Sequence, residues 1–194
     1  LAGDSGIDMA ESRLEHIAGP YHTFFTKRFD RERQNRIHFA SAMTMIGKNE
    51  ELVRDETPSY LDIVEFVQFS GIQIEEDLLQ LWRRMVFNIL ISNTDDHLRN
   101  HGFILTDKGW RLSPAFDINP SIDKFGLALN IDMDNNSPDI DLAKSLGIYF
   151  RLGKKEMDII IDEVKSGISG WKKIATEIGI SRNEQMLMAA AFKV

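Results

Sequence analysis

Apolar side chains recur every three or four positions along much of the chain, beginning near Phe39. The longest such segment runs from about Glu75 to Ser92 and forms one continuous stripe, which predicts a buried central helix. The same spacing returns later and predicts further helices at three places: Leu142 to Leu146, Met157 to Val164 and Trp171 to Ile178. A last helix should begin after Ser181, because Ser181 and Glu184 have the Ser-x-x-Glu spacing of a capping box.

Two regions have the pattern of β-hairpins instead. Residues rich in aromatic and branched side chains, Glu11 to Ile17 and His22 to Arg28, flank the turn dipeptide Gly19-Pro20. Phe103 to Leu105 and Trp110 to Leu112 flank a second turn that contains glycine. The pattern as a whole therefore predicts a mainly α (α+β) domain, a helical bundle with two small hairpins.

Composition restricts the classes of function. The chain has 194 residues, 43% of them hydrophobic, and the longest nearly uncharged apolar stretch, Met85 to Ile91, is far shorter than the ~20 residues that cross a bilayer. We therefore expect a soluble cytoplasmic protein that does not bind membranes. The absence of cysteine excludes disulfides, thiolate metal sites and a cysteine nucleophile. The first residue is Leu1 and not methionine, which suggests that the chain begins inside a larger protein.

The net charge of −7 opposes non-specific binding to duplex nucleic acid, because affinity for the phosphate backbone depends on clustered Lys and Arg. We expect no direct nucleic-acid binding by this chain. If phosphate is bound, the site should be local and assisted by a metal ion.

The richest candidate site is the polar stretch Asn93 to Asn100, which directly follows the central helix. Asp95 and Asn100 have the spacing Asp-x-x-x-x-Asn, and a further carboxylate, Asp117, comes after the second hairpin. Kinase-like folds use this order of residues for phosphoryl transfer. The first Asp accepts the proton of the attacking hydroxyl, the Asn binds a divalent cation, and the later Asp joins that cation to the nucleotide phosphates. Oxygen ligands of this kind suit Mg²⁺.

Other interpretations fit the same residues. Each of them could be a helix cap or a turn residue, in which case the chain would be a non-catalytic helical binding module with an acidic loop. Alternatively, a cluster of carboxylates and imidazoles could serve a metal-dependent hydrolase, because a four-residue helical step would put the two histidines on one face. The members of that cluster would be Asp95, Asp96, His97 and His101.

The stretch Asn93 to Asn100, followed by Trp110 to Asp117, resembles the C-terminal kinase lobe of HipA-type toxin serine/threonine kinases. The pattern of that family is Asp-x-His-x-Lys-Asn, a hairpin, and then Leu-x-Pro-x-aromatic-Asp. Upstream, Thr26 to Arg31 is similar to the Arg-Phe-Asp-Arg segment that ends the strand joining the two lobes. Three separated motifs thus occur in the order that the family has.

The resemblance implies a role for each matching residue. Asp95 would be the catalytic base, Asn100 and Asp117 would bind Mg²⁺, with Asn100 also part of the nucleotide site, and His97 would brace the catalytic loop. Arg99 stands where the family usually has Lys, which keeps a positive charge but changes its geometry.

The hinge match implies that the backbone groups of Lys27, Arg28 and Phe29 contact the adenine of ATP. Lys27 stands where an acidic residue is common, so only its backbone is expected to take part. Asp96 is variable in the family, and we expect a loop or cap role for it.

The resemblance also divides the chain and suggests partners. Residues 1–30 would be the end of the N-lobe and the hinge, and residues 31–194 would be the helical C-lobe, with the catalytic loop at 93–100 and the metal-binding carboxylate at Asp117. The substrate would be a Ser/Thr of a protein, such as an aminoacyl-tRNA synthetase, although a lipid kinase would use the same base and metal ligands. The partner would be a HipB-like DNA-binding antitoxin.

A kinase also needs a Gly-rich phosphate loop and a Lys that pairs with the nucleotide phosphates, and neither precedes the hinge motif in this sequence. We therefore expect residues 1–194 alone to transfer no phosphate.

Overall fold

The computed structural model describes residues 1–19, 21–123 and 125–194. Helix α4 (Ile74–Leu90) lies at its centre, and the predicted central helix is thereby confirmed. Every residue from Leu81 to Leu90 is buried, because α4 is covered on all sides by other elements. Trp82 is fully buried, and its indole Nε1 donates to the carbonyl oxygen of Ala143 at 3.4 Å.

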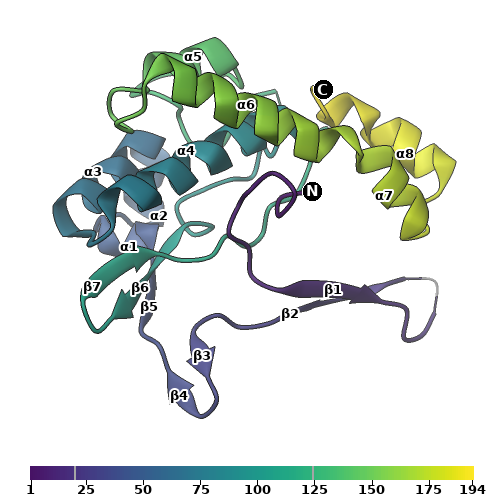
Figure 1. The fold of residues 1–194 in the computed structure, drawn as a ribbon, viewed down its shortest axis with the longest axis horizontal. Helices are drawn as coiled ribbons and strands as arrows, with labels where there is room; N and C mark the ends of the chain where they lie inside the picture. Colours follow the sequence, from purple (N-terminus) through teal and green to yellow (C-terminus); the bar gives the residue numbers. More distant parts are fainter. Residues whose placement is uncertain (20, 124) are drawn as a thin grey trace.

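The other helices surround α4 (Figure 1). α3, α5 and α6 pack directly against it, and α7 and α8 continue the chain beyond α6. The helices predicted after residue 140 and the one opened by Ser181 are confirmed. The bounds are α1 Ala42–Met45, α2 Glu50–Asp55, α3 Tyr60–Ser70, α5 Ile140–Ser145, α6 Lys154–Ser169, α7 Trp171–Glu177 and α8 Arg182–Met188, followed by a 3₁₀ turn at Ala189–Ala191.

Side-chain caps fix where several of these helices begin. Ser59 and Asp62 form a capping box at the start of α3, and Ser181 and Glu184 form the predicted one at the start of α8. These caps satisfy backbone N–H groups that have no partner in the first turn of a helix. The capping box at the start of α3 therefore fixes the position of Tyr60, which lies in the first turn of this helix.

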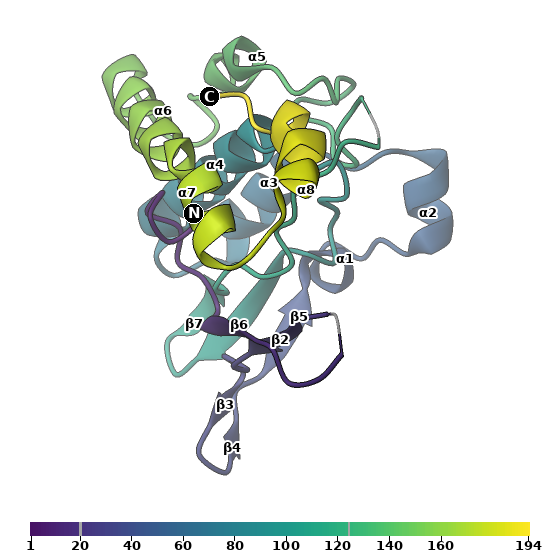
Figure 2. The same cartoon turned by 90° about the vertical axis from the view of Figure 1, so that its right-hand side faces the viewer.

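In the part of the chain that the structure describes, the strands form three small antiparallel sheets. Both predicted hairpins are confirmed: β1 (Ser12–Glu15) pairs with β2 (Thr23–Thr26), and β6 (Gly102–Thr106) pairs with β7 (Gly109–Leu112). Pro20, in the first predicted turn, lies outside the described residues. In Figure 1 the β1–β2 ribbon extends away from the helices, and Figure 2 shows most helices on one side of the strands.

Two strand regions differ from the sequence prediction. Helical spacing was expected from Phe39 onward, but β5 (Phe39–Ser41) joins β6 and makes that sheet three-stranded. Gly102 permits this pairing, since a Cβ there would come within 2.3 Å of the Phe39 ring. A further hairpin of two-residue strands, β3 (Arg31–Glu32) and β4 (Asn35–Arg36), is too short and too polar to leave an alternating apolar pattern.

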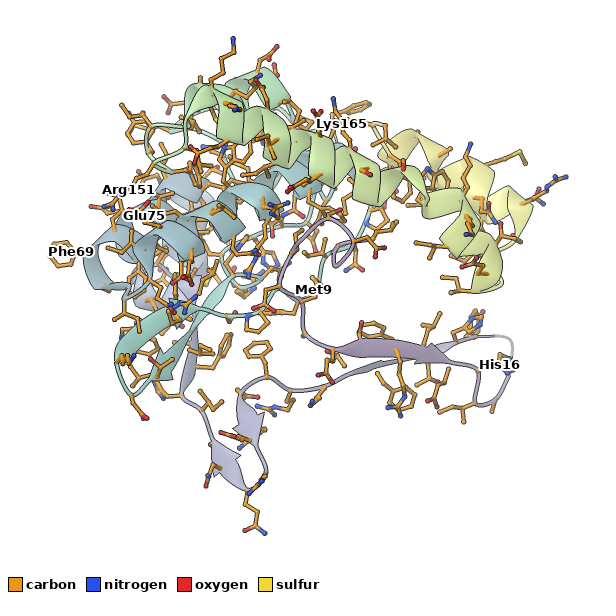
Figure 3. The ribbon with its side chains drawn as sticks, in the orientation of Figure 1. Met9, His16, Phe69, Glu75, Arg151 and Lys165 are labelled. Carbon is orange, nitrogen blue, oxygen red and sulfur yellow. The ribbon has the colours of Figure 1, made fainter. Side chains whose placement is uncertain are left out.

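The N-terminal segment packs on the helical body before it enters the β1–β2 ribbon. Ile7 and Ala10 are buried. The side-chain amide of Gln80 in α4 accepts a hydrogen bond from the backbone N–H of Asp8 and donates one to the backbone carbonyl of Gly6. Met9 bridges Ala115 in parallel, at the corner where the chain turns into the ribbon (Figure 3). Among the described residues, no helix is long and apolar enough to span a bilayer.

Candidate active site

The polar loop begins where α4 ends, and the helix itself holds its first residue. The backbone N–H of Asn93 donates to the carbonyl oxygen of Asn88 at 2.8 Å, and the Asn93 side-chain amide donates to Asn88 Oδ1 at 3.1 Å. Both side chains are buried. The loop is therefore attached to the most rigid element of the domain, which is a common arrangement for catalytic groups.

Asp96 anchors the middle of the loop. Its Oδ2 accepts a hydrogen bond from Tyr60 Oη at 2.5 Å and lies 2.9 Å from His101 Nε2. Asn88 Nδ2 in turn donates to Tyr60 Oη at 3.2 Å. Asp96 is only 2% exposed, so the role in the loop expected from the sequence is that of a buried anchor and not of a helix cap. The carboxylate is the centre of a buried polar network that joins α3, α4 and the loop at residues 93–100.

The environment keeps this carboxylate ionised. Burial by itself raises the pKa of the Asp96 carboxyl, but the His101 ring and the Tyr60 hydroxyl outweigh it and hold that pKa below its ordinary value. Burial and the neighbouring carboxylate raise the pKa of Tyr60 well above its ordinary value. Tyr60 is therefore a hydrogen-bond donor to a charged acceptor, an interaction stronger than one between neutral groups.

Asp95, directly before this anchor, is exposed, and its carboxyl faces solvent. Its backbone carbonyl accepts a hydrogen bond from Asn100 Nδ2 at 3.2 Å, and the Asn100 backbone N–H donates to the carbonyl of His97 at 2.8 Å. Within the described chain, Asn100 Oδ1 has no hydrogen-bond partner, so it is available as a metal ligand. His97 is half-buried, and its buried Nδ1 meets no partner among those residues.

The segment that carries Asp117 runs alongside the loop. Ser113 donates its backbone N–H to Gly102, just after the loop, and Ser121 donates to Ser92, just before it. These two hydrogen bonds, of 2.9 and 3.2 Å, join the two ends of segment 114–120 to the residues that flank loop 93–101, in antiparallel sense. Asp117 lies in the middle of that segment and is exposed.

Asp117 has a φ of 55°, in the left-handed region that few residues other than glycine adopt. Asp and Asn tolerate this conformation better than other side chains do. Asn119 Nδ2 donates to Asp117 Oδ1 at 3.0 Å and so orients the carboxylate, while Oδ2 has no hydrogen-bond partner among the described residues.

A cleft of ≈ 590 Å³ opens next to Asp117. Phe24 and Thr26 of β2 line it on one side, and Phe116 and Asp117 line it on the other. A smaller pocket of ≈ 240 Å³ shares Thr26 and Phe116 with it and is lined further by the residues of the predicted hinge, Lys27, Arg28, Phe29 and Asp30. The two hollows together connect the hinge to the candidate metal-binding carboxylate.

Three aromatic rings fix the walls of this region. Phe29 of the hinge, Phe39 of β5 and Phe116 meet with ring-centroid distances of 5.4, 5.7 and 6.1 Å. Contacts of this kind are favourable beyond the area that they bury. The cluster ties the hinge to the residue that immediately precedes Asp117.

The side chains of the predicted hinge are engaged with neighbouring acids. Lys27 pairs with Glu11 at 3.0 Å, and Arg28 pairs with Asp30 at 2.5 Å. The Lys27 backbone N–H also donates to the Glu11 carbonyl, whereas within the described chain the backbone N–H groups of Arg28 and Phe29 have no partner. Of the three residues, Arg28 and Phe29 therefore have amides available to a ligand.

The structure also shows the surroundings of Arg99 and the conformation of the segment that carries His97 and His101. Arg99 forms an ion pair with Glu50 of α2, so its charge is shared with an acid. Residues 97–101 are not helical, and no group of three or more His, Asp or Glu in the described residues is placed to hold a metal ion. The helical step on which the hydrolase interpretation depended is therefore wrong.

Comparison with known proteins adds independent information. The family model described as the HipA-like C-terminal domain matches residues 1–171. A protein of Sinorhizobium fredii named "Putative kinase Y4mE" is 23% identical over 188 residues, covering 93% of this chain and 39% of its own length. The chain thus spans about two fifths of that relative.

Two solved structures have a similar fold. HipA of Shewanella oneidensis, solved with HipB and operator DNA, matches 98% of this chain and 50% of its own, at 18% identity and a TM-score of 0.75. The Helicobacter pylori proinflammatory kinase CtkA matches 87% of this chain and 79% of its own, at 13% identity and a TM-score of 0.55. The mostly helical α+β fold is thus one that kinases have.

Proposed function

The chain belongs to the HipA-like C-terminal domain family, and from this premise we propose that it is the catalytic C-lobe of a protein kinase that transfers the γ-phosphoryl group of ATP to Ser or Thr. One observation carries the proposal most directly. A single cleft is lined both by β2, which leads into the hinge, and by Asp117, and the Asp117 segment runs beside the catalytic loop.

The donor set fits Mg²⁺. Asn100 Oδ1 and the Asp117 carboxylate are hard oxygen ligands, and neither is fully occupied by protein donors in the described chain. In this proposal they hold the metal ion, which when bound would neutralise charge on the nucleotide phosphates. Asn119 orients the Asp117 carboxylate, and the Asp95 carbonyl orients the Asn100 amide.

Asp95 is the proposed general base. An exposed carboxylate can reach the hydroxyl of a protein substrate, accept its proton as the oxygen attacks phosphorus, and release it to solvent afterwards. The neighbouring buried Asp96 keeps the loop backbone in place while Asp95 remains accessible. His97 is proposed to brace the same loop.

The nucleotide base would lie near the hinge. The unpartnered backbone amides of Arg28 and Phe29 and the smaller pocket beside them support this assignment, and Lys27 contributes through its backbone carbonyl. We keep the division at residue 30 as a proposal. Within residues 1–30, the side chains of Ser5, Ile7 and Ala10 are already buried.

The partner proposals rest on relatives. HipA of Shewanella oneidensis was solved with HipB and operator DNA, which supports a HipB-like antitoxin for this protein. The protein substrate is proposed from the family alone, with an aminoacyl-tRNA synthetase as the first candidate. The rest of the kinase is expected from the part of the longer relatives that this chain does not match.

Replacement of Asp117 by Asn tests the metal assignment. Asn suits the left-handed backbone at this position, so the fold should persist while the charge is lost. Changes in residues that merely orient a metal ligand already weaken metal binding about 10- to 100-fold, so Asp117→Asn should weaken Mg²⁺-dependent ATP binding by at least about tenfold. Isothermal titration of the full-length protein with ATP, with and without Mg²⁺, measures this directly.

Asp107→Asn is the matched control for this experiment. Asp107 is also exposed, but it lies in the turn between β6 and β7. ATP binding by Asp107→Asn should equal that of the wild type at every Mg²⁺ concentration. Equal binding by Asp117→Asn and wild type would rule out Asp117 as a metal ligand.

A further inference from the structure

Arg84 is a buried cation behind the candidate site, and the proposed mechanism does not use it. It lies on α4 and is 2% exposed. Its Nη2 donates to the carbonyl oxygen of Ser113 at 2.7 Å, whereas its Nε and Nη1, both buried, have no partner in the described part of the chain. A guanidinium is rarely taken out of water in this way unless nearby charges compensate for the lost hydration.

The charges of carboxylates from three different segments offset part of that cost. Burial lowers the pKa of Arg84 to about 10, and the charges of Asp8, Asp96 and Asp77 act in the opposite direction. Arg84 therefore remains positively charged at neutral pH. Asp8 belongs to the N-terminal segment, Asp96 is the anchor of the catalytic loop, and Asp77 lies two turns earlier on α4.

Arg84 is linked to both motifs of the proposed active site. Ser113, its hydrogen-bond acceptor, begins the segment that leads to Asp117 and also donates its backbone N–H to the carbonyl oxygen of Gly102, just after the loop, at 2.9 Å. Backbone hydrogen bonds join the N-terminal segment to the same region, because Ala115 donates to Asp8 at 2.7 Å. The guanidinium thus lies where these three pieces of chain meet.

We propose that Arg84 is a positioning residue that fixes the Ser113–Asp117 segment against the catalytic loop, so that Asp117 and Asn100 can hold the same metal ion. This inference rests on the proposed kinase function. A lysine at this position would keep the charge, but its compact ammonium could not reproduce the planar guanidinium that reaches Ser113. Changes in residues that orient metal ligands typically weaken metal binding about 10- to 100-fold.

Arg83 offers a matched control one position earlier on the same helix. It is also buried, at 8% exposed, and it also donates to a backbone carbonyl, that of Ser5 at 2.9 Å. Its carboxylate partner is Glu163 of α6 at 2.7 Å. None of these partners belongs to the catalytic loop or to the Asp117 segment, so Arg83→Lys should perturb stability without changing the metal site.

The experiment compares wild type, Arg84→Lys and Arg83→Lys in the full-length protein. ATP binding is titrated at a series of Mg²⁺ concentrations, and the melting temperature of each variant is measured in parallel. Arg84→Lys should need about 10- to 100-fold more Mg²⁺ for half-maximal ATP binding. Arg83→Lys should retain the Mg²⁺ dependence of the wild type even where its melting temperature falls by the same amount.

Two results would overturn the inference: a wild-type Mg²⁺ dependence in Arg84→Lys, or an equal shift in both variants. If Arg84→Lys does not fold, Arg84→Gln, which removes the cation but keeps a side-chain N–H donor, is tested against the same two criteria. Failure of the proposed function has a different signature, since the wild-type protein would then bind no ATP at any Mg²⁺ concentration, and the inference would fail with it.

Discussion

Asp95→Asn should nearly abolish phosphoryl transfer while leaving ATP binding and stability close to those of the wild type. A positioned general base contributes about 10²- to 10⁴-fold to the rate, and an amide cannot accept the proton of the attacking hydroxyl. Nucleotide affinity should persist because Asn100 and Asp117, not Asp95, are the proposed metal ligands. Transfer of radiolabelled phosphate from ATP by the full-length protein, with ATP binding measured separately, checks both halves of this result.

The variants Asp95→Asn and Asp117→Asn should differ in ATP binding. Asp117→Asn should lose Mg²⁺-dependent binding together with transfer, whereas Asp95→Asn should lose transfer alone. An equal loss of ATP binding in the two variants would mean that Asp95 is a ligand or a structural residue and not the base.

Asp96→Ala should have the largest effect on stability at the site. The change leaves the hydroxyl of Tyr60 without its acceptor, removes the partner of His101 Nε2 and deprives buried Arg84 of one neighbouring carboxylate. Removal of one partner from a buried charged network typically costs about 3–5 kcal/mol. Urea unfolding of wild type and variant measures the loss directly.

Asp95→Ala is the control for that measurement, because Asp95 is adjacent in sequence but exposed. Its free energy of unfolding should stay within about 0.5 kcal/mol of the wild type, as is usual for surface positions. Similar losses in the two alanine variants would contradict the assignment of Asp96 as the buried anchor and Asp95 as the accessible base.

The contribution of Asp96 to the free energy of unfolding should also depend on pH. The folded state holds the pKa of this carboxyl below its ordinary value of about 3.9, so its stabilisation is complete above about pH 4. It is lost as the pH falls through the folded-state pKa. The difference in unfolding free energy between wild type and Asp96→Ala should therefore shrink in acid.

Local sequence patterns were sufficient for most of the fold. The apolar stripe of α4, the capping box of α8 and the two flanked turns each depend on residues within a few positions of one another, and all were confirmed. The pairing of β5 with β6 was missed because it depends on Gly102, some sixty residues away, which leaves room for the Phe39 ring.

In the candidate site, too, features that depend on local spacing could be predicted, whereas features that depend on residues distant in sequence could not. Asp95, Asn100 and Asp117 can be selected from spacing, because phosphoryl transfer requires those residue types in that order. The role of Asp96 could not be found in this way, since its partner Tyr60 lies 36 positions earlier, at the start of α3. In the sequence Arg84 is one more polar residue on a helix, because its burial and its hydrogen bond to Ser113 depend on segments that are distant in sequence.

A crystal structure of the full-length protein with Mg²⁺ and a non-hydrolysable ATP analogue would test the central claim most directly. We predict a metal ion at about 2.0–2.1 Å from both Asn100 Oδ1 and an Asp117 carboxylate oxygen, the distance typical of Mg²⁺, with the adenine against the backbone of Arg28 and Phe29. Asp95 should face the γ-phosphate without touching the metal. A metal ion bound away from Asn100 and Asp117, or a nucleotide outside the cleft between β2 and Asp117, would contradict the account.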